Sequence, residues 1–245
     1  MKASKIVGLN SVKKEIVEIV EKKEFYKRCN ISPTHMLFAG LGSGNGCSTI
    51  SNWITDIFFE NDIRPFTSLD LSLEFKPDGK TKENLDNVFS AIETASVYKN
   101  HYEGNIFINL DDVIPYANDS HVTDFIYGIS EIGRYATLFF FIDTSKRNAS
   151  TLINKIKSSI VDINIVDVEP YSIDDLVTIT KQMIKEHGVT IDDDTNAIIG
   201  NLISIRNIKK AKECVHLKNE IIKHTNISSE ILSLSAKDIK TKCVY

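Results

Sequence analysis

The sequence predicts an α/β protein in which a parallel sheet of five strands is followed by a smaller helical domain. Five short apolar runs alternate with longer amphipathic segments in the first two thirds of the chain. This alternation is typical of a doubly wound parallel sheet with crossover helices. After Pro170 the apolar runs stop and only helical periodicity continues. We therefore expect an α/β domain at residues 1–168 and a helical lid domain at residues 169–245.

Hydrophobic periodicity places the expected elements in order along the chain. Strands are expected at residues 35–39, 66–71, 105–110, 138–142 and 162–166. Helices are expected at residues 11–29, 50–60, 173–187, 193–203 and 205–224. In the helix at residues 50–60, Trp53 has core spacing with Ile50, Ile54 and Ile57, so this face should be buried.

Composition narrows the classes of function. With 245 residues, of which 42% are hydrophobic, the chain can bury a substantial core. Its 29 Lys and Arg against 33 Asp and Glu offer no electrostatic support for nucleic acid or anionic lipid as a partner. The four cysteines form no CxxC pair, which argues against a zinc knuckle or a disulfide framework. No apolar run is long enough to span a bilayer, so we expect a soluble cytoplasmic protein without a membrane partner.

A glycine-rich stretch directly follows the first expected strand. Residues 40–49 read Gly-Leu-Gly-Ser-Gly-Asn-Gly-Cys-Ser-Thr, and glycines between a strand and a helix let backbone N–H groups point at a phosphate. The phosphate-loop pattern GxxxxGK[ST] places Cys47 at the lysine, Ser48 at the magnesium-binding hydroxyl and Leu41 at the first glycine. A flexible loop without a ligand stays open as the alternative. The candidate phosphate-binding residues are Gly42, Gly44, Asn45, Gly46, Cys47, Ser48 and Thr49.

An acidic pair follows the third expected strand. Asp111 and Asp112 come directly after residues 105–110, and a carboxylate at this end of an apolar strand is the Walker B arrangement that holds magnesium through water. Asp112 stands where hydrolytic sites usually carry a longer glutamate. Ser145, or Thr144 beside it, follows the next strand and could complete the site. The candidate catalytic residues are Asp111, Asp112 and Ser145, and the candidate metal ligands are Ser48 and Asp111; alternatively, the two acids only cap the strand end.

Further stretches carry a resemblance to a known family. They are Ile6-Val-Gly-Leu-Asn-Ser-Val-Lys-Lys-Glu15, Pro170-Tyr-Ser-Ile-Asp-Asp-Leu176, Gly200-Asn-Leu-Ile-Ser-Ile-Arg-Asn207 and Leu234-Ser-Ala-Lys-Asp-Ile239. Together with the loop, and in this order, they resemble the AAA+ ATPase family, most closely the branch with red-type Rubisco activase and stage V sporulation protein K. The resemblance covers nearly the whole chain. It implies strand order 5-1-4-3-2, ATP or ADP with magnesium as cofactor, and adenine contacts at Val7 and Gly8.

The same resemblance reveals missing charges. Cys47 replaces the loop lysine, Ile203 replaces the arginine of the lid, and residues 156–160 contain no arginine finger. Arg206 remains as a candidate phosphate contact. The loop lysine contributes about 1.5–3 kcal/mol, or about ten- to a hundredfold in affinity, whereas an arginine finger contributes about 10³–10⁵ in rate. Nucleotide binding should therefore be weakened and hydrolysis weak or absent, with Cys47 an inert filler of the space of the lysine.

The resemblance and the missing charges predict a degenerate AAA+ subunit that acts as a scaffold or regulatory partner. The expected partners are proteins: copies of itself or an active AAA+ paralogue, with another protein as the target. An active but slow ATPase that remodels proteins is the alternative, with Lys146 or Arg147 supplying the missing cation. A plain interaction module whose loop binds nothing is also compatible with the sequence.

Overall fold

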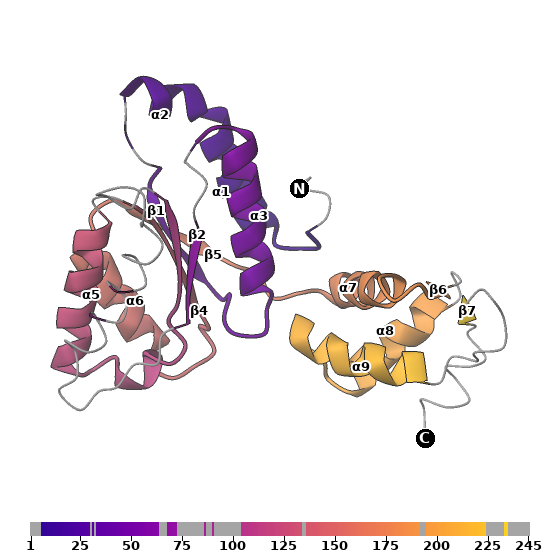
Figure 1. The fold of residues 1–245 in the computed structure, drawn as a ribbon. Helices are drawn as coiled ribbons and strands as arrows, with labels where there is room; N and C mark the ends of the chain where they lie inside the picture. Colours follow the sequence, from indigo (N-terminus) through magenta and orange to yellow (C-terminus); the bar gives the residue numbers. More distant parts are fainter. Residues whose placement is uncertain are drawn as a thin grey trace. The chain divides into compact units, whose positions relative to one another are not determined.

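The chain forms two compact units (Figure 1). The computed structural model describes residues 6–29, 31, 33–63, 68–72, 86, 90, 104–133, 136–191, 195–223 and 233–234. The first unit contains the described residues of Asn10–Ser43 and Cys47–Glu169, and the second those of Ile6–Leu9, Gly44–Gly46 and Pro170–Tyr245. The two units are therefore not separated by a single boundary in the chain, because the short segments Ile6–Leu9 and Gly44–Gly46 belong to the second unit.

A parallel sheet of five strands forms the centre of the first unit. Its strands are β1 (His35–Ala39), β2 (Ser68–Ser72), β3 (Asn105–Asn109), β4 (Thr137–Ile142) and β5 (Ile163–Asp167). They lie in the order β2-β3-β4-β1-β5, and every pairing is parallel. In the register of the central strand β1, Leu37 is opposite Phe140 on one side and Ile165 on the other. The predicted α/β class with a parallel sheet is confirmed; residues 66 and 67 of the second expected strand lie outside the described residues.

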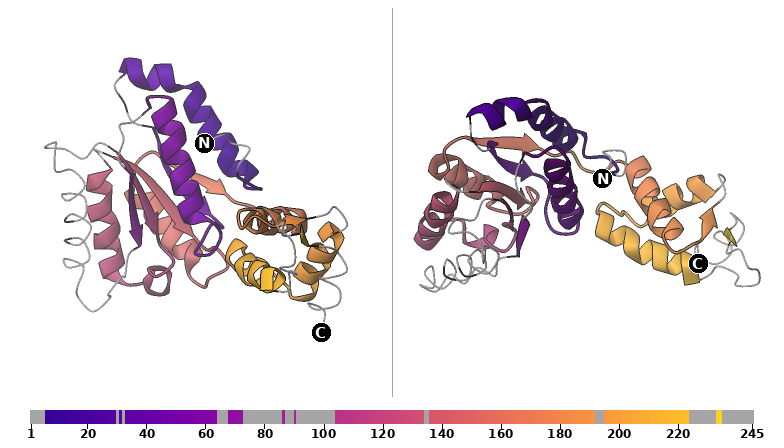
Figure 2. Two further views of the ribbon diagram at one scale, coloured as in Figure 1. Left: turned by 45° about the vertical axis from the view of Figure 1, so that its right-hand side comes forward. Right: turned by 45° about the horizontal axis from the view of Figure 1, so that its top comes forward.

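Helices cover both faces of this sheet (Figures 1 and 2). The helices of the first unit are α1 (Asn10–Glu21), α2 (Lys23–Cys29), α3 (Cys47–Glu60), α5 (Ser120–Ile132) and α6 (Ala149–Ser159), with a short 3-10 helix η2 (Ile114–Tyr116). In the figures α1 and α3 lie on one side of the sheet, and α5 and α6 lie on the other. The first unit is therefore a three-layer sandwich.

Alternate residues of the strands fill two hydrophobic layers, because successive side chains point to opposite faces. On one face, Leu37, Ile106 and Phe140 share a buried cluster with residues of α5 and α6. On the other face, rings from β1, β3 and β4 stack with centroids 4.9 to 6.2 Å apart: Phe38, Phe107, Phe139 and Phe141. Phe58 of α3 meets Phe139 edge to face at 6.0 Å. Ile50, Trp53 and Ile54 are also buried, as predicted, whereas Ile57, the fourth residue of the expected core face, is only partly buried.

The prediction of a single helix at residues 11–29 is wrong, because the structure has two helices that are separated at Lys22. Helix α1 buries Val12, Ile16 and Ile19, whereas α2 buries none of its residues. Polar contacts hold α2 instead: Lys23 Nζ donates to Asn61 Oδ1 at 3.3 Å, and Lys27 lies 3.5 Å from Asp62. The chain breaks its helix where the buried apolar stripe ends.

The second unit is mainly helical. It contains α7 (Ile173–Lys185), α8 (Thr195–Ile205) and α9 (Ala211–Lys223), whose buried residues form one cluster. The expectation of an all-helical domain is wrong, since β6 (Thr190–Ile191) and β7 (Ser233–Leu234) pair in parallel. The helix expected from residue 205 begins only at Ala211, because Asn207 has φ +52° and ends the preceding helix. Burial raises the pKa of the Cys214 thiol in this core.

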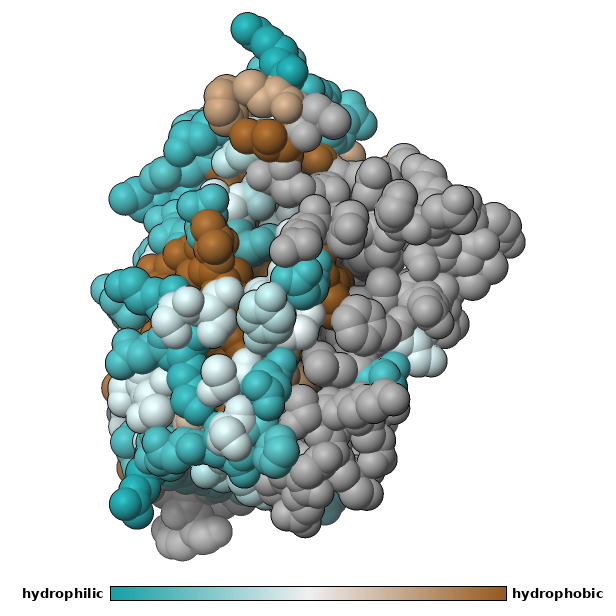
Figure 3. Space-filling model, turned by 90° about the vertical axis from the view of Figure 1, so that its left-hand side faces the viewer, coloured by the Kyte–Doolittle hydropathy of each residue, from teal (hydrophilic) through white to brown (hydrophobic). Residues whose placement is uncertain are grey.

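The surface keeps several large apolar side chains exposed. Figure 3 shows hydrophobic residues among hydrophilic ones on one face of the molecule. In the part of the chain that the structure describes, the exposed ones on or beside α1, α2 and α3 are Val17, Phe25, Ile31 and Phe59. Of the helices described, none has the length and apolarity that crossing a membrane requires.

Removing the N-terminal cap of α7 should destabilise the second unit. Ser172 Oγ accepts from the Asp175 N–H at 3.1 Å, and the Asp175 carboxylate accepts from the Ser172 N–H at 3.0 Å, which is a capping box. We expect Ser172→Ala to lower the free energy of unfolding by about 1 kcal/mol in urea denaturation followed by circular dichroism. Ser204→Ala, whose hydroxyl donates to the Gly200 carbonyl within α8, should change it by less than about 0.5 kcal/mol. Equal losses in the two variants would contradict the role of the cap.

Candidate functional site

The first half of the glycine-rich loop lies against the ends of two other strands. A Cβ at Gly42 would lie 2.4 Å from Asp143 Cβ and 2.8 Å from Asp111 Oδ2. Only glycine fits at this distance without a shift of the neighbouring chain. Leu41, at the position of the first glycine in the phosphate-loop pattern, is 1% exposed and belongs to the core. This departure from the pattern thus has a packing role.

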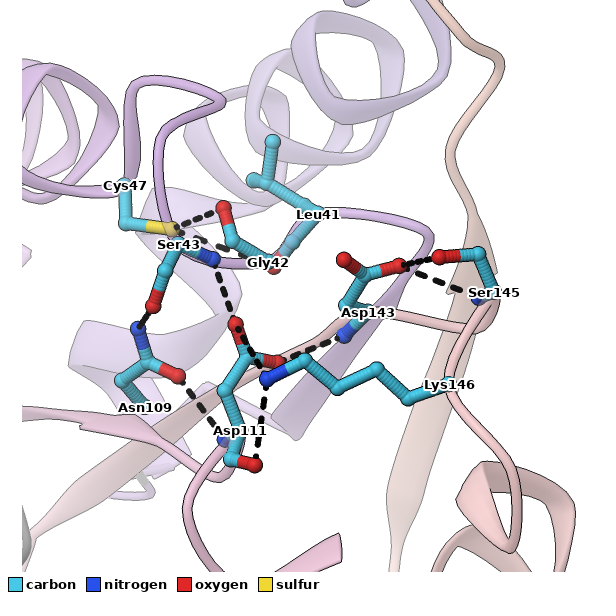
Figure 4. A network of polar contacts seen from close by, with 9 residues as sticks. All are labelled: Leu41, Gly42, Ser43, Cys47, Asn109, Asp111, Asp143, Ser145 and Lys146. Atoms are coloured by element: carbon cyan, nitrogen blue, oxygen red, sulfur yellow. Dashed lines mark hydrogen bonds and ion pairs between the residues drawn. The ribbon is translucent and has the colours of Figure 1, made fainter. Parts of the chain in front are cut away.

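The Asp111 carboxylate is the centre of the polar network in the first unit (Figure 4). Its Oδ2 accepts from the Ser43 N–H at 2.6 Å, and its Oδ1 accepts from the Asp143 N–H at 2.9 Å. The Lys146 ammonium lies 3.7 Å from Oδ2 and donates to the Asp111 carbonyl at 3.2 Å. Asp111 is 3% exposed. Each oxygen of this buried carboxylate therefore has a partner, as burial of a charge requires.

Asn109 fixes the loop from the last position of β3. Its Nδ2 donates to Ser43 Oγ at 2.9 Å, and its Oδ1 accepts from the Asp111 N–H at 2.9 Å. Ser43 is thus held through both its backbone and its side chain. Neither Asn109 nor Ser43 was a candidate in the sequence, although the strand-end position of Asn109 was a usable signal.

The other two candidate catalytic residues do not contact Asp111 in the described interactions. Ser145 is exposed, and both its Oγ and its N–H bond to Asp143 Oδ1, at 2.5 and 3.0 Å. Asp112 is exposed, as is Thr144. Asp143 was not among the candidate residues, although it directly follows β4 as Asp111 follows Leu110. The structure joins Asp111 with Asp143 and Lys146 instead.

Cys47 is the first residue of α3 and turns toward the loop that precedes it. Its Sγ donates to the Gly42 carbonyl at 3.2 Å and reaches the Leu41 carbonyl at 3.8 Å. These contacts direct the sulfur to the backbone of the loop. Ser48 and Thr49 follow in the first turn and are exposed. The positive end of the helix therefore presents two hydroxyl groups to the solvent.

The tip of the loop, Gly44–Gly46, belongs to the second unit. The Gly44 carbonyl accepts from the Lys212 N–H at 2.8 Å, and the Asn45 carbonyl accepts from the Tyr171 hydroxyl at 2.9 Å. A Cβ at Gly44 would lie 3.2 Å from Lys212 Cβ and 3.8 Å from Lys210 Cδ. Two lysines thus flank the tip, and the basic run at residues 209–212 was the signal that could have found them.

Glu213 anchors the start of α9 beside this tip. Its carboxylate accepts from the backbone N–H groups of Lys209 at 2.7 Å and Lys210 at 3.0 Å. The bond from Lys209 is the main cause that lowers the pKa of Glu213, and burial opposes it. An ionised cap at this position fixes the start of α9, where Lys210 directly precedes the helix and Lys212 lies in its first turn.

Other candidate nucleotide contacts also lie in the second unit. Val7 and Gly8 are half-buried, and a Cβ at Gly8 would lie 3.1 Å from Asp175 Cγ. Arg206 forms a two-point ion pair with Glu220, with Nη to Oε distances of 2.5 and 2.9 Å. Its guanidinium is therefore held by α9, and a phosphate would have to compete with Glu220 for it.

Comparison with solved structures identifies the fold. The sequence matches no protein-family model and no curated protein. An arginine-to-alanine variant of RuvB from Thermotoga maritima is similar over 97% of this chain and 69% of its own, with 16% identity and a TM-score of 0.62. A lysine-to-arginine variant of RuvB is similar over 96% and 69%, with 16% identity and the same TM-score. The FIGL-1 AAA domain is similar over 98% and 81%, with 13% identity and a TM-score of 0.62. The chain has an AAA+ ATPase fold; the particular branch stays a prediction.

The residues at the strand ends do not fit the magnesium ion that this fold generally implies. Magnesium needs oxygen ligands in near-octahedral geometry. Both oxygens of Asp111 already accept hydrogen bonds, and an ammonium lies beside one of them. Within the described ranges, no group of three or more His, Cys, Asp or Glu residues could hold a metal ion. In this arrangement Asp111 is a structural acceptor.

Replacing Gly42 by alanine will test the contact between the loop and the two strand ends. The added Cβ overlaps Asp143 and Asp111, so we expect Gly42→Ala to lower the free energy of unfolding by about 2–3 kcal/mol in urea denaturation. Gly200→Ala is the control, because its Cβ would make an ordinary contact with Val177 at 3.6 Å. The free energy of unfolding of that variant should rise by about 0.5–1 kcal/mol, because Gly200 lies in the interior of α8, where alanine is the better helix former. If Gly42→Ala were as stable as the wild type, the loop could not lie where this structure places it.

Proposed function

We propose that this protein is a degenerate AAA+ subunit that binds a nucleotide weakly, hydrolyses it slowly or not at all, and acts as a scaffold or regulatory partner. The observation that carries the proposal is the AAA+ fold in which Cys47 replaces the loop lysine and bonds to the carbonyls of its own loop. A cysteine in this position supplies no positive charge to stabilise the charge that develops on a transferring phosphoryl group.

The other charged positions support weak or absent hydrolysis. Ile203, where the family has an arginine, is 1% exposed and packs in the helical core. Arg206 is paired with Glu220, and Ser145 is paired with Asp143. Arg206 and Ser145 thus bond to side chains of the same protein. The site accordingly favours a static binding role.

Weak phosphate binding remains compatible with what the loop retains. The first turn of α3 exposes Ser48 and Thr49 at the positive end of a helix, which attracts anions. We therefore propose ATP or ADP as the ligand.

A protein partner is supported by the surface of α2. This helix buries none of its residues, and Phe25 on it is 56% exposed. The Ile31 N–H donates to the Tyr26 carbonyl at 3.2 Å, so Ile31, which is 48% exposed, lies next to the same helix. Neighbouring exposed apolar side chains are typical of interaction surfaces. We propose that another copy of this chain or an active AAA+ paralogue binds here.

One contact favours the alternative of a slow ATPase that remodels proteins. The Lys146 ammonium lies 3.7 Å from the carboxylate of Asp111, the candidate Walker B residue. A cation is therefore present within the first unit although the loop lysine is absent. In this alternative, Lys146 with Arg147 would supply the missing charge. The proposal of a scaffold does not need turnover, whereas the alternative does.

Restoring the loop lysine should strengthen nucleotide binding. We expect the wild type to bind ATP and ADP weakly in calorimetric titration and to show a small rise in melting temperature. Cys47→Lys should increase the affinity about ten- to a hundredfold, the usual contribution of a charge-assisted hydrogen bond. Cys47→Ser is the matched control. Its affinity should stay within about threefold of the wild-type affinity, because serine adds no charge.

One outcome would contradict this prediction, and a separate measurement of phosphate release tests the alternative function. Unchanged affinity in Cys47→Lys would show that the loop is not a phosphate site, and the interaction module would then explain the protein better. Robust phosphate release by the wild type that disappears in a Lys146→Ala, Arg147→Ala double variant would favour the slow ATPase. Turnover that survives the double variant would defeat that alternative.

Polar substitution on α2 should weaken association without unfolding the protein. We expect Phe25→Ser to raise the dissociation constant of self-association, or of binding to an AAA+ paralogue, at least tenfold in analytical ultracentrifugation. Its exposed side chain predicts a change in unfolding free energy of less than about 0.5 kcal/mol. Val161→Ser, at another surface position that is 80% exposed, should leave association unchanged. A wild type that stays monomeric with nucleotide and with the paralogue would argue against the scaffold.

A further inference from the structure

The contacts of Lys146 set this lysine apart from a surface cation. Its Nζ is shared between the Oδ2 of Asp111, at 3.7 Å, and the carbonyl of the same residue, at 3.2 Å. The lysine side chain is 40% exposed, whereas the aspartate side chain is 3% exposed. A partly exposed lysine thus brings a positive charge to a buried carboxylate.

The network links this ammonium to the loop. Asp111 Oδ2, the oxygen that faces Lys146, also accepts from the Ser43 N–H at 2.6 Å. An anion that approaches this part of the loop therefore meets a carboxylate, and repulsion would oppose binding unless a cation neutralises the carboxylate. Magnesium commonly has this role for polyphosphates. In this chain Lys146 holds a positive charge on the same oxygen.

We propose that Lys146 is a built-in counter-ion that replaces magnesium, so that this protein binds nucleoside di- or triphosphates in their metal-free form. The inference rests on the proposed nucleotide-binding function and specifies its ligand. An ammonium carries three donors, and the described contacts direct it to two atoms of Asp111. Because the side chain of Lys146 is 40% exposed, a phosphate oxygen can approach it from solvent while the charge of Asp111 stays balanced. A magnesium ion would have to share Asp111 with this ammonium, and the two cations would repel each other.

The proposal makes magnesium dispensable in the wild type and useful only when Lys146 is lost. Calorimetric titration with ATP and with inorganic pyrophosphate, each in EDTA and in excess magnesium, measures this directly. We expect the wild-type affinity to agree within about threefold between the two conditions. Lys146→Met should weaken metal-free binding about tenfold or more, which corresponds to the loss of a charge-assisted contact. Magnesium should then partly restore binding, because the ammonium no longer repels it and the Asp111 carboxylate, which keeps its two backbone hydrogen bonds, could hold the ion through water.

Two further variants control for charge and for folding. Lys146→Arg keeps the cation and should keep binding independent of magnesium, whereas Lys185→Met removes an exposed lysine of α7 and should change neither condition. The wild-type comparison needs no variant, so the proposal stays testable even if Lys146→Met does not fold.

The outcomes distinguish the inference from the function on which it rests. A wild-type affinity at least tenfold lower in EDTA than in excess magnesium would overturn the counter-ion role. It would leave the proposed nucleotide binding intact. Lys146→Met with wild-type affinity in EDTA would do the same. Absence of binding by the wild type in both conditions would overturn the nucleotide site itself, and the role of Lys146 with it.

Discussion

The buried carboxylate of Asp111 is the interaction on which the polar site of the first unit depends. A carboxylate away from water is stable only when hydrogen bonds and opposite charge compensate its desolvation. Here the loop after β1 provides the Ser43 N–H, the end of β4 provides the Asp143 N–H, and Lys146 provides the charge. The close approach at Gly42 follows from this arrangement, because the loop must come near enough to donate.

The sheet brings these groups together before any ligand is involved. In a parallel sheet the carboxyl ends of all strands lie at one edge, and β4 lies between β1 and β3. Pairing of Asn109 with Phe141 places Asp111 and Asp143 just beyond the ends of neighbouring strands. The stacked phenylalanine rings on one face and the aliphatic cluster on the other hold this register, since a slip of one residue would exchange the two faces.

Several side chains at the positions that the proposed function depends on bond or pack within the protein itself. A thiol that bonds to its own loop replaces the lysine, and the lid position of the arginine is a core isoleucine. The arginine that remains nearby is paired within the helical unit. At two of these positions an uncharged side chain stands in place of a cation, and at the third the cation is paired with Glu220. These contacts are the basis of the proposed function, in which the framework binds a protein partner and phosphoryl transfer is weak or absent.

The sequence by itself determined the α/β class, the parallel sheet, the buried face of α3 and Asp111 as a strand-end acid, because local periodicity encodes these features. Only the tertiary structure decided which groups meet. Asn109, Asp143 and Lys146 are separated from the loop by many residues, and their contacts exist only after the strands align. The break at Lys22 and the late start of α9 also depend on contacts and backbone angles that periodicity does not encode. The pairing of Arg206 with Glu220 joins two helices, and no local pattern specifies it.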